Sequence, residues 1–189
     1  MTQAEQKLRR VFWYFNRYFM APMFRLGLGS FMGNPASGYI MVIQNRGQKT
    51  GKTRHTPVNY AILDGQVYCM AGYGKASDWY CNIRAKPQVE LLLPGRAIAA
   101  QAEEVTHPAE RLIAARQVLI NGGFAGFFFG FNPRTVSDET LHTALGSIPL
   151  LRFRPTGIGS GEADPGGWLW ILGAVATLGW LLLGRRRKQ

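Results

Sequence analysis

Six short runs that suit β-strands, two pairs of which are separated by tight-turn signals, are the feature that most limits how this chain can fold. These runs cover residues 38–44, 56–63, 66–72, 88–94, 97–105 and 149–154. Asp64-Gly65 and Pro94-Gly95 each separate two runs at a position suited to a hairpin turn. Helices are expected between them only at Ser77–Ala85 and Pro108–Ile120. Short strands joined by hairpins, with few helices, predict a mainly β (α+β) domain built on a small antiparallel barrel.

The C-terminal end carries an uncharged run from Gly166 to Gly184. At 1.5 Å per residue it spans about 28 Å, enough for the hydrocarbon core of a bilayer. Tryptophans lie near its ends, where indole rings favour the membrane interface, and Arg185–Lys188 follow directly. A helix that is apolar on every face has no obvious place inside so small a soluble domain. We therefore expect a Gly/Pro linker over 157–167, a single-pass transmembrane helix over 168–184 and a basic tail over 185–189.

Two arguments about the side of the membrane on which the domain lies conflict with each other. The positive-inside rule places the basic tail in the cytoplasm. No N-terminal signal peptide that would export the domain is recognisable, because basic residues interrupt the apolar N-terminal region. We expect a C-terminal anchor in membrane lipid with the domain in the cytoplasm.

Residues 1–30 predict an aromatic and basic amphipathic helix, which Pro22 is expected to end. The apolar face of such a helix can lie on the surface of a membrane, and it can equally well pack on the domain or on a second subunit. Both interpretations stay open. The residues at helical spacing are Leu8, Phe12, Phe15 and Phe19, interleaved with Lys7, Arg9, Arg10 and Arg17.

A net charge of +11, from 22 basic and 11 acidic residues, indicates an anionic partner. Nucleic acid is not expected, because the chain has no zinc spacing, helix-turn-helix pattern or RNP-like motif. The densest cationic segment lies between two predicted strands, where glycines let the backbone turn and present its amides. It suits phosphate or carboxylate oxygens, although a charged hairpin tip would look similar. Its residues are Gly47, Lys49, Thr50, Gly51, Lys52 and Arg54.

A second candidate region follows the strand that ends at Ala71-Gly72. A loop containing glycine leads into a helix for which Ser77 or Asp78 is the expected N-cap. Free amides at such a helix start can also bind a ligand anion. Trp79 suits either the core or a pocket wall.

The cysteines and histidines predict no metal site. Cys69 and Cys81 form no CxxC pair and are expected to be small core residues in a reducing compartment. The three histidines have no spacing that suggests a triad or a ligand set.

Taken in order along the chain, these motifs resemble the deazaflavin (F420)-dependent nitroreductase and quinone reductase family. The similarity is close over residues 40 to about 105 and looser up to Thr156. The matching residues are Gly47, Lys49, Thr50, Gly51, Arg54 and Pro57, then Asp64-Gly65 and Ala71-Gly72, then Trp79-Tyr80, Asn82-Ile83, Ala85 and Pro87.

The resemblance implies coenzyme F420 and, over residues 31–156, a split β-barrel with flanking helices that is related to FMN-binding split barrels. The phosphate and polyglutamate tail of F420 would meet the loop Lys49–Arg54, and the loop Ala71–Ser77 would border the deazaflavin ring. The implied cofactor-binding residues are Gly47, Lys49, Thr50, Gly51, Lys52, Arg54, Pro57, Ala71, Gly72, Tyr73, Gly74, Ser77, Trp79, Tyr80 and Asn82.

The resemblance also implies hydride transfer from reduced F420 to a lipophilic acceptor, which is a quinone, a nitroaromatic or an activated alkene. The redox chemistry would reside in the cofactor, so no metal is required and no catalytic residue is assigned. Relatives that reduce nitroimidazoles often carry tyrosines where this chain has the Phe-rich segment 121–131. Phe124, Phe127 and Phe128 are expected to line an apolar substrate pocket, although a core or membrane-facing segment would look the same.

Three alternatives concern the cofactor, the activity and the assembly. An FMN-dependent reductase could use the same barrel, and a non-enzymatic barrel could bind a lipid or fatty acid. The basic loop argues against the second, because a fatty acid does not need three cations. A homodimer is a further option.

Overall fold

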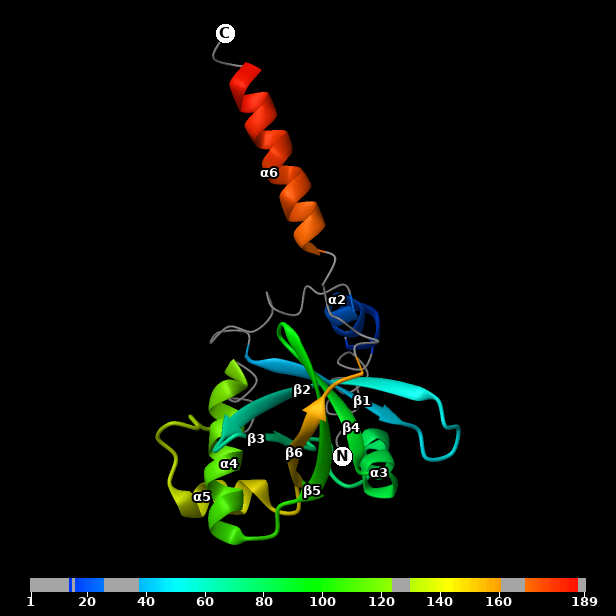
Figure 1. Cartoon of the computed structure of the whole chain (residues 1–189). Coiled ribbons are helices and arrows are strands. Elements are labelled where there is room, and N and C mark those ends of the chain that lie inside the picture. Colours follow the sequence, from blue (N-terminus) through cyan, green and yellow to red (C-terminus); the bar gives the residue numbers. More distant parts are fainter. Residues whose placement is uncertain (1–13, 15, 26–37, 124–129, 161–168, 187–189) are drawn as a thin grey trace.

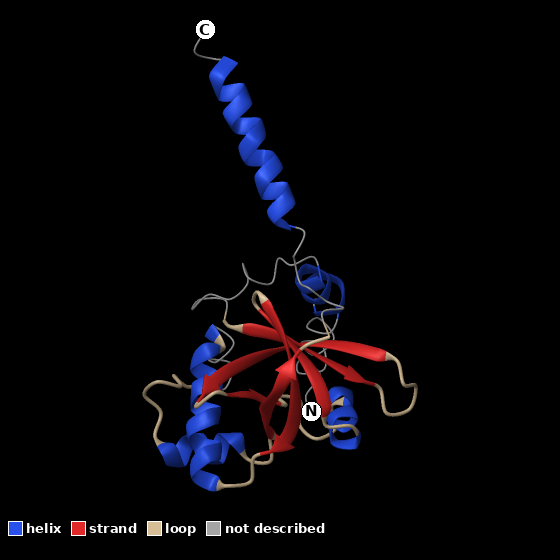
Figure 2. Ribbon diagram, in the orientation of Figure 1, coloured by secondary structure: helices blue, strands red, loops and turns tan. Residues whose placement is uncertain are grey.

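The strands form one closed antiparallel barrel in the order β1-β2-β3-β6-β5-β4 (Figure 1). The computed structural model describes residues 14, 16–25, 38–123, 130–160 and 169–186. Its strands are β1 (Ile40–Arg46), β2 (Thr53–Leu63), β3 (Gln66–Met70), β4 (Gln88–Leu93), β5 (Arg96–Glu104) and β6 (Leu150–Ile158). Its helices are η1 (Asn16–Met20), α2 (Ala21–Arg25), α3 (Asp78–Ala85), α4 (Pro108–Asn121), α5 (Asp138–Leu145) and α6 (Leu169–Arg186). Helices η1 to α5 lie around the strands, which confirms the predicted mainly β barrel with flanking helices (Figure 2).

Both predicted hairpin turns are confirmed. Asp64 and Gly65 have φ values of 49° and 73°, as a type I′ turn requires, and Leu63 pairs with Gln66 across them. Gly95 has a φ of 77° in the β4–β5 turn. The first hairpin is longer than predicted, because pairing between β1 and β2 continues to Arg46 and Thr53.

One strand is longer than predicted, and one helix was not predicted. β6 continues to Ile158, two residues into the predicted linker, because Gly157 and Ile158 pair with Ala99 and Ile98 of β5. α5 was not predicted at all. It is short and largely polar, and its N-cap is Ser137, whose Oγ accepts a hydrogen bond from the Thr140 N–H at 3.2 Å.

Two hydrophobic clusters stabilise the barrel. The first fills its interior, where alternate residues of each strand point inward, and it includes Met41, Ile43, Leu91 and Phe153, none of which is exposed to solvent. The second lies between the sheet and the helices α4 and α5. Its members include Ala61, Val118, Leu141 and Leu150.

The described part of the N-terminal region packs on the barrel. Met20 and Phe24 are only 2% and 1% exposed and contact Val42 and Leu92 on the outer face of β1 and β4. Pro22 does not end the helix as predicted. It is the second residue of α2, where a missing backbone N–H breaks no intrahelical hydrogen bond, and α2 continues to Arg25.

Figure 1 shows α6 standing apart from the barrel. Its exposed apolar side chains are Leu172, Val175, Leu178, Trp180 and Leu182. Among the residues that the structure describes, no helix meets the combined length and hydropathy of a membrane span.

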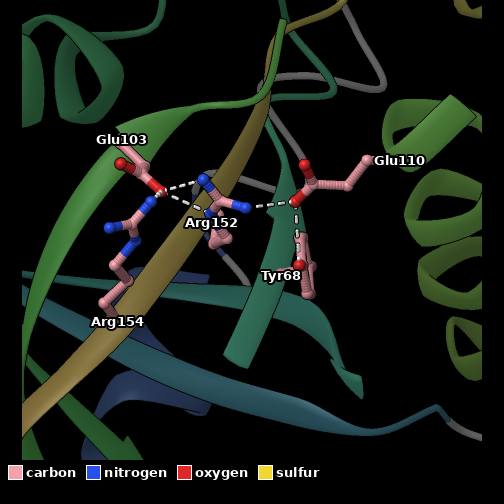
Figure 3. A network of polar contacts seen from close by, with 5 residues as sticks. All are labelled: Tyr68, Glu103, Glu110, Arg152 and Arg154. Carbon is pink, nitrogen blue, oxygen red and sulfur yellow. Dashed lines mark hydrogen bonds and ion pairs between the residues drawn. The ribbon is translucent and has the colours of Figure 1, made fainter. Parts of the chain in front are cut away.

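A network of polar contacts ties α4 to the sheet (Figure 3). The Tyr68 hydroxyl donates to Glu110 Oε1 at 2.9 Å, and Arg152 binds the same oxygen at 2.6 Å. Glu103 pairs with Arg152 and, at 2.7 Å, with Arg154. Burial and the hydrogen bond to Glu110 together raise the pKa of Tyr68. These contacts join β3, β5 and β6 to the first turn of α4.

A smaller network fixes α3 against β5. The Tyr80 hydroxyl donates to Glu104 Oε2 at 2.6 Å, and Arg84 binds the same oxygen at 2.8 Å. Partial burial opposes ionisation of Glu104, but the hydrogen bonds from Tyr80 and Arg84 outweigh it and hold the pKa of Glu104 below its ordinary value of 4.5.

We predict that Glu104→Gln lowers the free energy of unfolding by about 1 kcal/mol at pH 7, because it removes a charge-assisted hydrogen bond. A depressed carboxyl pKa contributes stability above the unfolded-state pKa and loses it as pH falls through the folded-state pKa. The difference from the wild type should therefore shrink as pH falls below about 4.5. Urea unfolding at several pH values measures the difference in unfolding free energy between Glu104→Gln and the wild type. A difference that does not change with pH would contradict the lowered pKa of Glu104.

Candidate functional site

The basic segment predicted from the sequence is the tip of the β1–β2 hairpin, residues 47–52. The Gly47 N–H donates to Lys52 O at 2.9 Å, and the Gly51 N–H donates to Gly47 O at 2.8 Å, so the tip closes on itself. Gly51 has a φ of 65°, which side-chain-bearing residues rarely adopt. The Thr50 hydroxyl takes part in the turn, because it accepts a hydrogen bond from the Lys52 N–H at 3.4 Å.

Two buried amide side chains hold this hairpin tip against α3. Asn82 Oδ1 accepts from the Gln48 N–H at 2.9 Å, and Asn45 Nδ2 donates to Trp79 O at 3.2 Å. Asn45 is 3% exposed and Asn82 is 8% exposed. Because each amide bridges the hairpin and α3, the tip has a defined position relative to the start of that helix.

Four cationic side chains are displayed on or beside the tip. Lys49, Lys52 and Arg54 are exposed, as is Arg46 at the end of β1. None of them forms an ion pair within the described part of the chain. Arg54 is the register partner of Asn45, and Arg46 is the partner of Thr53. This concentration of unneutralised positive charge on a fixed loop suits an anionic ligand.

The loop Ala71–Ser77 links the end of β3 to the start of α3. Gly74, with a φ of 74°, donates its N–H to Ala71 O at 2.6 Å and accepts at its own carbonyl from the Ser77 hydroxyl at 2.9 Å. Ser77 occupies the N-cap position, but its side chain makes no capping hydrogen bond and is 4% exposed. The Ser77 hydroxyl therefore stabilises the loop and forms no hydrogen bond with the first backbone N–H groups of α3.

The remaining predicted cofactor residues lie in different environments. Pro57 is half-buried in β2 opposite Val42, and Trp79 is half-buried against the barrel core. Gly72 and Tyr73 are exposed. Tyr80 points into the core toward Glu104. The structure thus brings the hairpin tip and α3 together, and the Ala71–Ser77 loop leads directly into this helix. The Tyr80 hydroxyl is engaged by Glu104 instead.

Asn45 and Arg46 begin the basic segment that the sequence predicts to bind an anion, but neither residue was assigned a role there. Arg46 could have been found from the hairpin register, since it stands opposite Thr53 once the strands are extended. Asn45 follows Met41 and Ile43 on the inward-facing side of β1, so a polar residue there is a signal of a specific contact. The predicted substrate residues Phe124, Phe127 and Phe128 lie outside the described residues.

Two hollows formed by the described residues are small. One of about 150 Å³ lies between α4 and α5, lined by residues that include Arg111 and His142. Another of about 170 Å³ lies between α3 and β5, beside Arg84 and Glu104. Both are below the several hundred Å³ usual for a cofactor pocket. The hairpin tip is an open surface, which suits the flexible tail of a ligand better than its ring.

The two cysteines differ in burial. Cys69 is fully buried, and burial raises the pKa of its thiol far above the usual range. Cys81 is half-buried, with Sγ 3.3 Å from Lys75 O.

Residues 23–125 match the sequence profile of a family described as F420H(2)-dependent quinone reductase, and this is more than half of the 189 residues. The chain belongs to this family. Its cofactor is accordingly coenzyme F420, which decides against the alternative of FMN. The matched region contains the hairpin tip, the Ala71–Ser77 loop and α3. No curated protein matches the chain.

The solved structures to which the chain is similar share little sequence identity with it. A putative 5-nitroimidazole antibiotic resistance protein from Bacteroides thetaiotaomicron VPI-5482 is 9% identical, with 63% of this chain and 74% of that chain covered and a TM-score of 0.47. An F420-H2 dependent reductase (FDR-A) is 19% identical, with 61% and 93% covered and a TM-score of 0.45. A protein described as a domain-swapped dimer is 19% identical, with 61% and 79% covered and a TM-score of 0.46.

We predict that Asn82→Ala weakens F420 binding by a few-fold to about tenfold, because loss of one hydrogen bond frees the Gln48 backbone and loosens the hairpin tip. Fluorescence titration with F420 measures the effect. Thr143→Ala is the control, because it also removes one side-chain-to-backbone hydrogen bond, the one that the Thr143 hydroxyl donates to Glu139 O at 2.9 Å within α5. Equal affinities for Asn82→Ala and the wild type would contradict the role given to Asn82.

Proposed function

We propose that the protein transfers a hydride from reduced F420 to a lipophilic acceptor, with a quinone as the first candidate and a nitroaromatic or an activated alkene as the others. Reduced F420 supplies the hydride when it is bound. The residues of the chain bind and orient it. The observation that carries the proposal is the hairpin tip, where Arg46, Lys49, Lys52 and Arg54 surround a loop fixed by two buried amides.

The hairpin tip fits the charged tail of F420, which contains a phosphate and glutamate carboxylates. The guanidinium group of Arg54 can bind two oxygens at once, whereas Lys49 and Lys52 act as point charges. Asn45 and Asn82 order the loop before the ligand arrives, so less conformational entropy is lost on binding. The deazaflavin ring would then lie toward the Ala71–Ser77 loop and the start of α3.

A double substitution tests the placement of the tail. Lys49→Ala with Arg54→Ala should weaken F420 binding by about tenfold or more at low salt, because two charge-assisted contacts are lost. The loss should be smaller at high salt, where the wild-type contacts are screened. Lys86→Ala with Arg134→Ala removes the same charge from exposed positions elsewhere and should leave the affinity near that of the wild type. Unchanged affinity in the first variant would place the tail elsewhere.

The acceptor is tested with reduced F420 and a menaquinone analogue, followed by the recovery of F420 absorbance. We expect oxidation well above the enzyme-free rate, and a slower rate with water-soluble acceptors of similar potential. The apolar acceptor is supported by the Phe-rich segment at 121–131. Binding of F420 without turnover of any acceptor would favour a non-enzymatic role, and absence of F420 binding would contradict the proposed activity altogether.

We further propose that α6 anchors the enzyme in a membrane, with the domain in the cytoplasm. Its exposed apolar side chains and the basic residues Arg185–Lys188 at its C-terminal end support the anchor. Such an anchor would keep the site close to acceptors dissolved in the bilayer.

A homodimer is proposed as the assembly. In such a dimer, the second copy would supply a wall for the deazaflavin ring beside the open hairpin tip. Light scattering in detergent should give the mass of two chains, and the mass of one chain would contradict the dimer.

A further inference from the structure

The N-terminal helices η1 and α2 contact β2 and bury their apolar side chains on the outer face of β1 and β4. Met20 and Phe24 contact Val42 and Leu92, which are register partners on these two strands. Ala97 of β5, the register partner of Leu92, packs against the same cluster. The described N-terminal segment is therefore held there by buried apolar contacts.

The chain leaves the barrel after β6 across the same face. The Gly159 N–H donates to Ala97 O at 3.0 Å. Ser160 donates its N–H to Glu90 Oε1 at 2.8 Å and its hydroxyl to Glu90 Oε2 at 2.9 Å. Glu90 also accepts from Gln44 Nε2 at 3.3 Å. We call these contacts of Glu90 and Ala97 with Gly159 and Ser160 the exit clamp.

The exit clamp and the N-terminal helices are close neighbours. Glu90 pairs with Gln44, and two residues along the same strands Leu92 pairs with Val42. Side chains two residues apart share a face and are about 7 Å apart. Position 159 also requires glycine, because a Cβ there would overlap Glu90 Oε1 and lie 2.8 Å from the Ala97 Cβ.

The side of the N-terminal helices that faces away from the barrel is aromatic. Tyr14, Tyr18 and Phe19 are 52%, 65% and 44% exposed, in contrast to the buried Met20 and Phe24. The rings of Tyr14 and Tyr18 stack with centroids 5.9 Å apart. An exposed cluster of large aromatic side chains beside a positively charged sequence is typical of a surface that meets the lipid headgroup region.

We infer that the outer face of β1 and β4 is the side of the barrel turned toward a bilayer of anionic lipid. Tyr14, Tyr18 and Phe19 rest in the headgroup region, and the exit clamp directs the chain toward α6 from the same face. This inference rests on the proposed membrane anchoring by α6. The net charge of +11 favours anionic lipid as the occupant over an apolar protein surface. The hairpin tip thereby has a fixed orientation relative to the membrane.

An environment-sensitive NBD label at position 18 tests the inference in the full-length protein. The label is attached through Tyr18→Cys in a Cys81→Ser background, where Cys69 is buried and does not react. Ile113→Cys on α4 is the matched control, because Ile113 is 63% exposed and Tyr18 is 65% exposed. With vesicles of phosphatidylcholine and phosphatidylglycerol, we expect a blue shift of the emission at position 18 and none at position 113.

Flotation of the same vesicles separates the two proposals. Protein that floats without a blue shift at position 18, or with equal shifts at both positions, would overturn the inferred orientation while leaving the membrane anchor intact. Protein that does not float would overturn the anchor and the inference with it.

The exit clamp is tested by Gly159→Ala, with Gly157→Ala as the control because a Cβ at position 157 meets no atom within 4 Å. Gly159→Ala should reduce the blue shift at position 18 without reducing flotation. The reason is that α6 still anchors the protein, but the barrel no longer has a fixed orientation relative to the membrane. Gly157→Ala should behave as the parent protein does. An undiminished shift in Gly159→Ala would overturn the role of the clamp.

Discussion

Pairing of β1 with both β2 and β4 closes the sheet into a barrel, and the position of every other element depends on this closure. One side of β1 points into the barrel and carries Met41, Ile43 and then Asn45, so the interior changes from apolar to polar at one end. α3 packs at that end and the hairpin tip bends toward it. The opposite side of β1 carries Val42 and Gln44, which hold the N-terminal helices and, through Glu90, the exit of the C-terminal segment.

The hairpin tip combines two properties that rarely occur together on a loop. Its backbone is fixed by Asn45, Asn82 and its own glycines, yet its cations have no partners among the described residues. Clustered like charges repel one another, so a loop of this kind is held together by its backbone and by α3 until an anion binds. The family to which the chain belongs uses F420. In our proposal, the charged tail of F420 is the anion that the loop binds.

The fold was largely predictable because its main signals are local. Asp64-Gly65 sets a type I′ turn by itself, and inward-facing apolar residues mark each strand. Pro22 and α5 were misjudged because a proline suits the first turn of a helix as well as its end, and because a short polar helix has little periodicity. The site was predictable in its cations but not in Asn45. That residue becomes meaningful only when Trp79, 34 positions along the chain, is placed beside it.

Hydrogen exchange of the β1–β2 loop, measured with and without F420, tests the central claim most directly. If the hairpin tip holds the tail of the cofactor, amides of residues 47–52 should exchange more slowly when F420 is bound, and those of the β2–β3 turn at Asp64-Gly65 should not change. Protection elsewhere with none at residues 47–52 would contradict the assignment of this loop as the anion site.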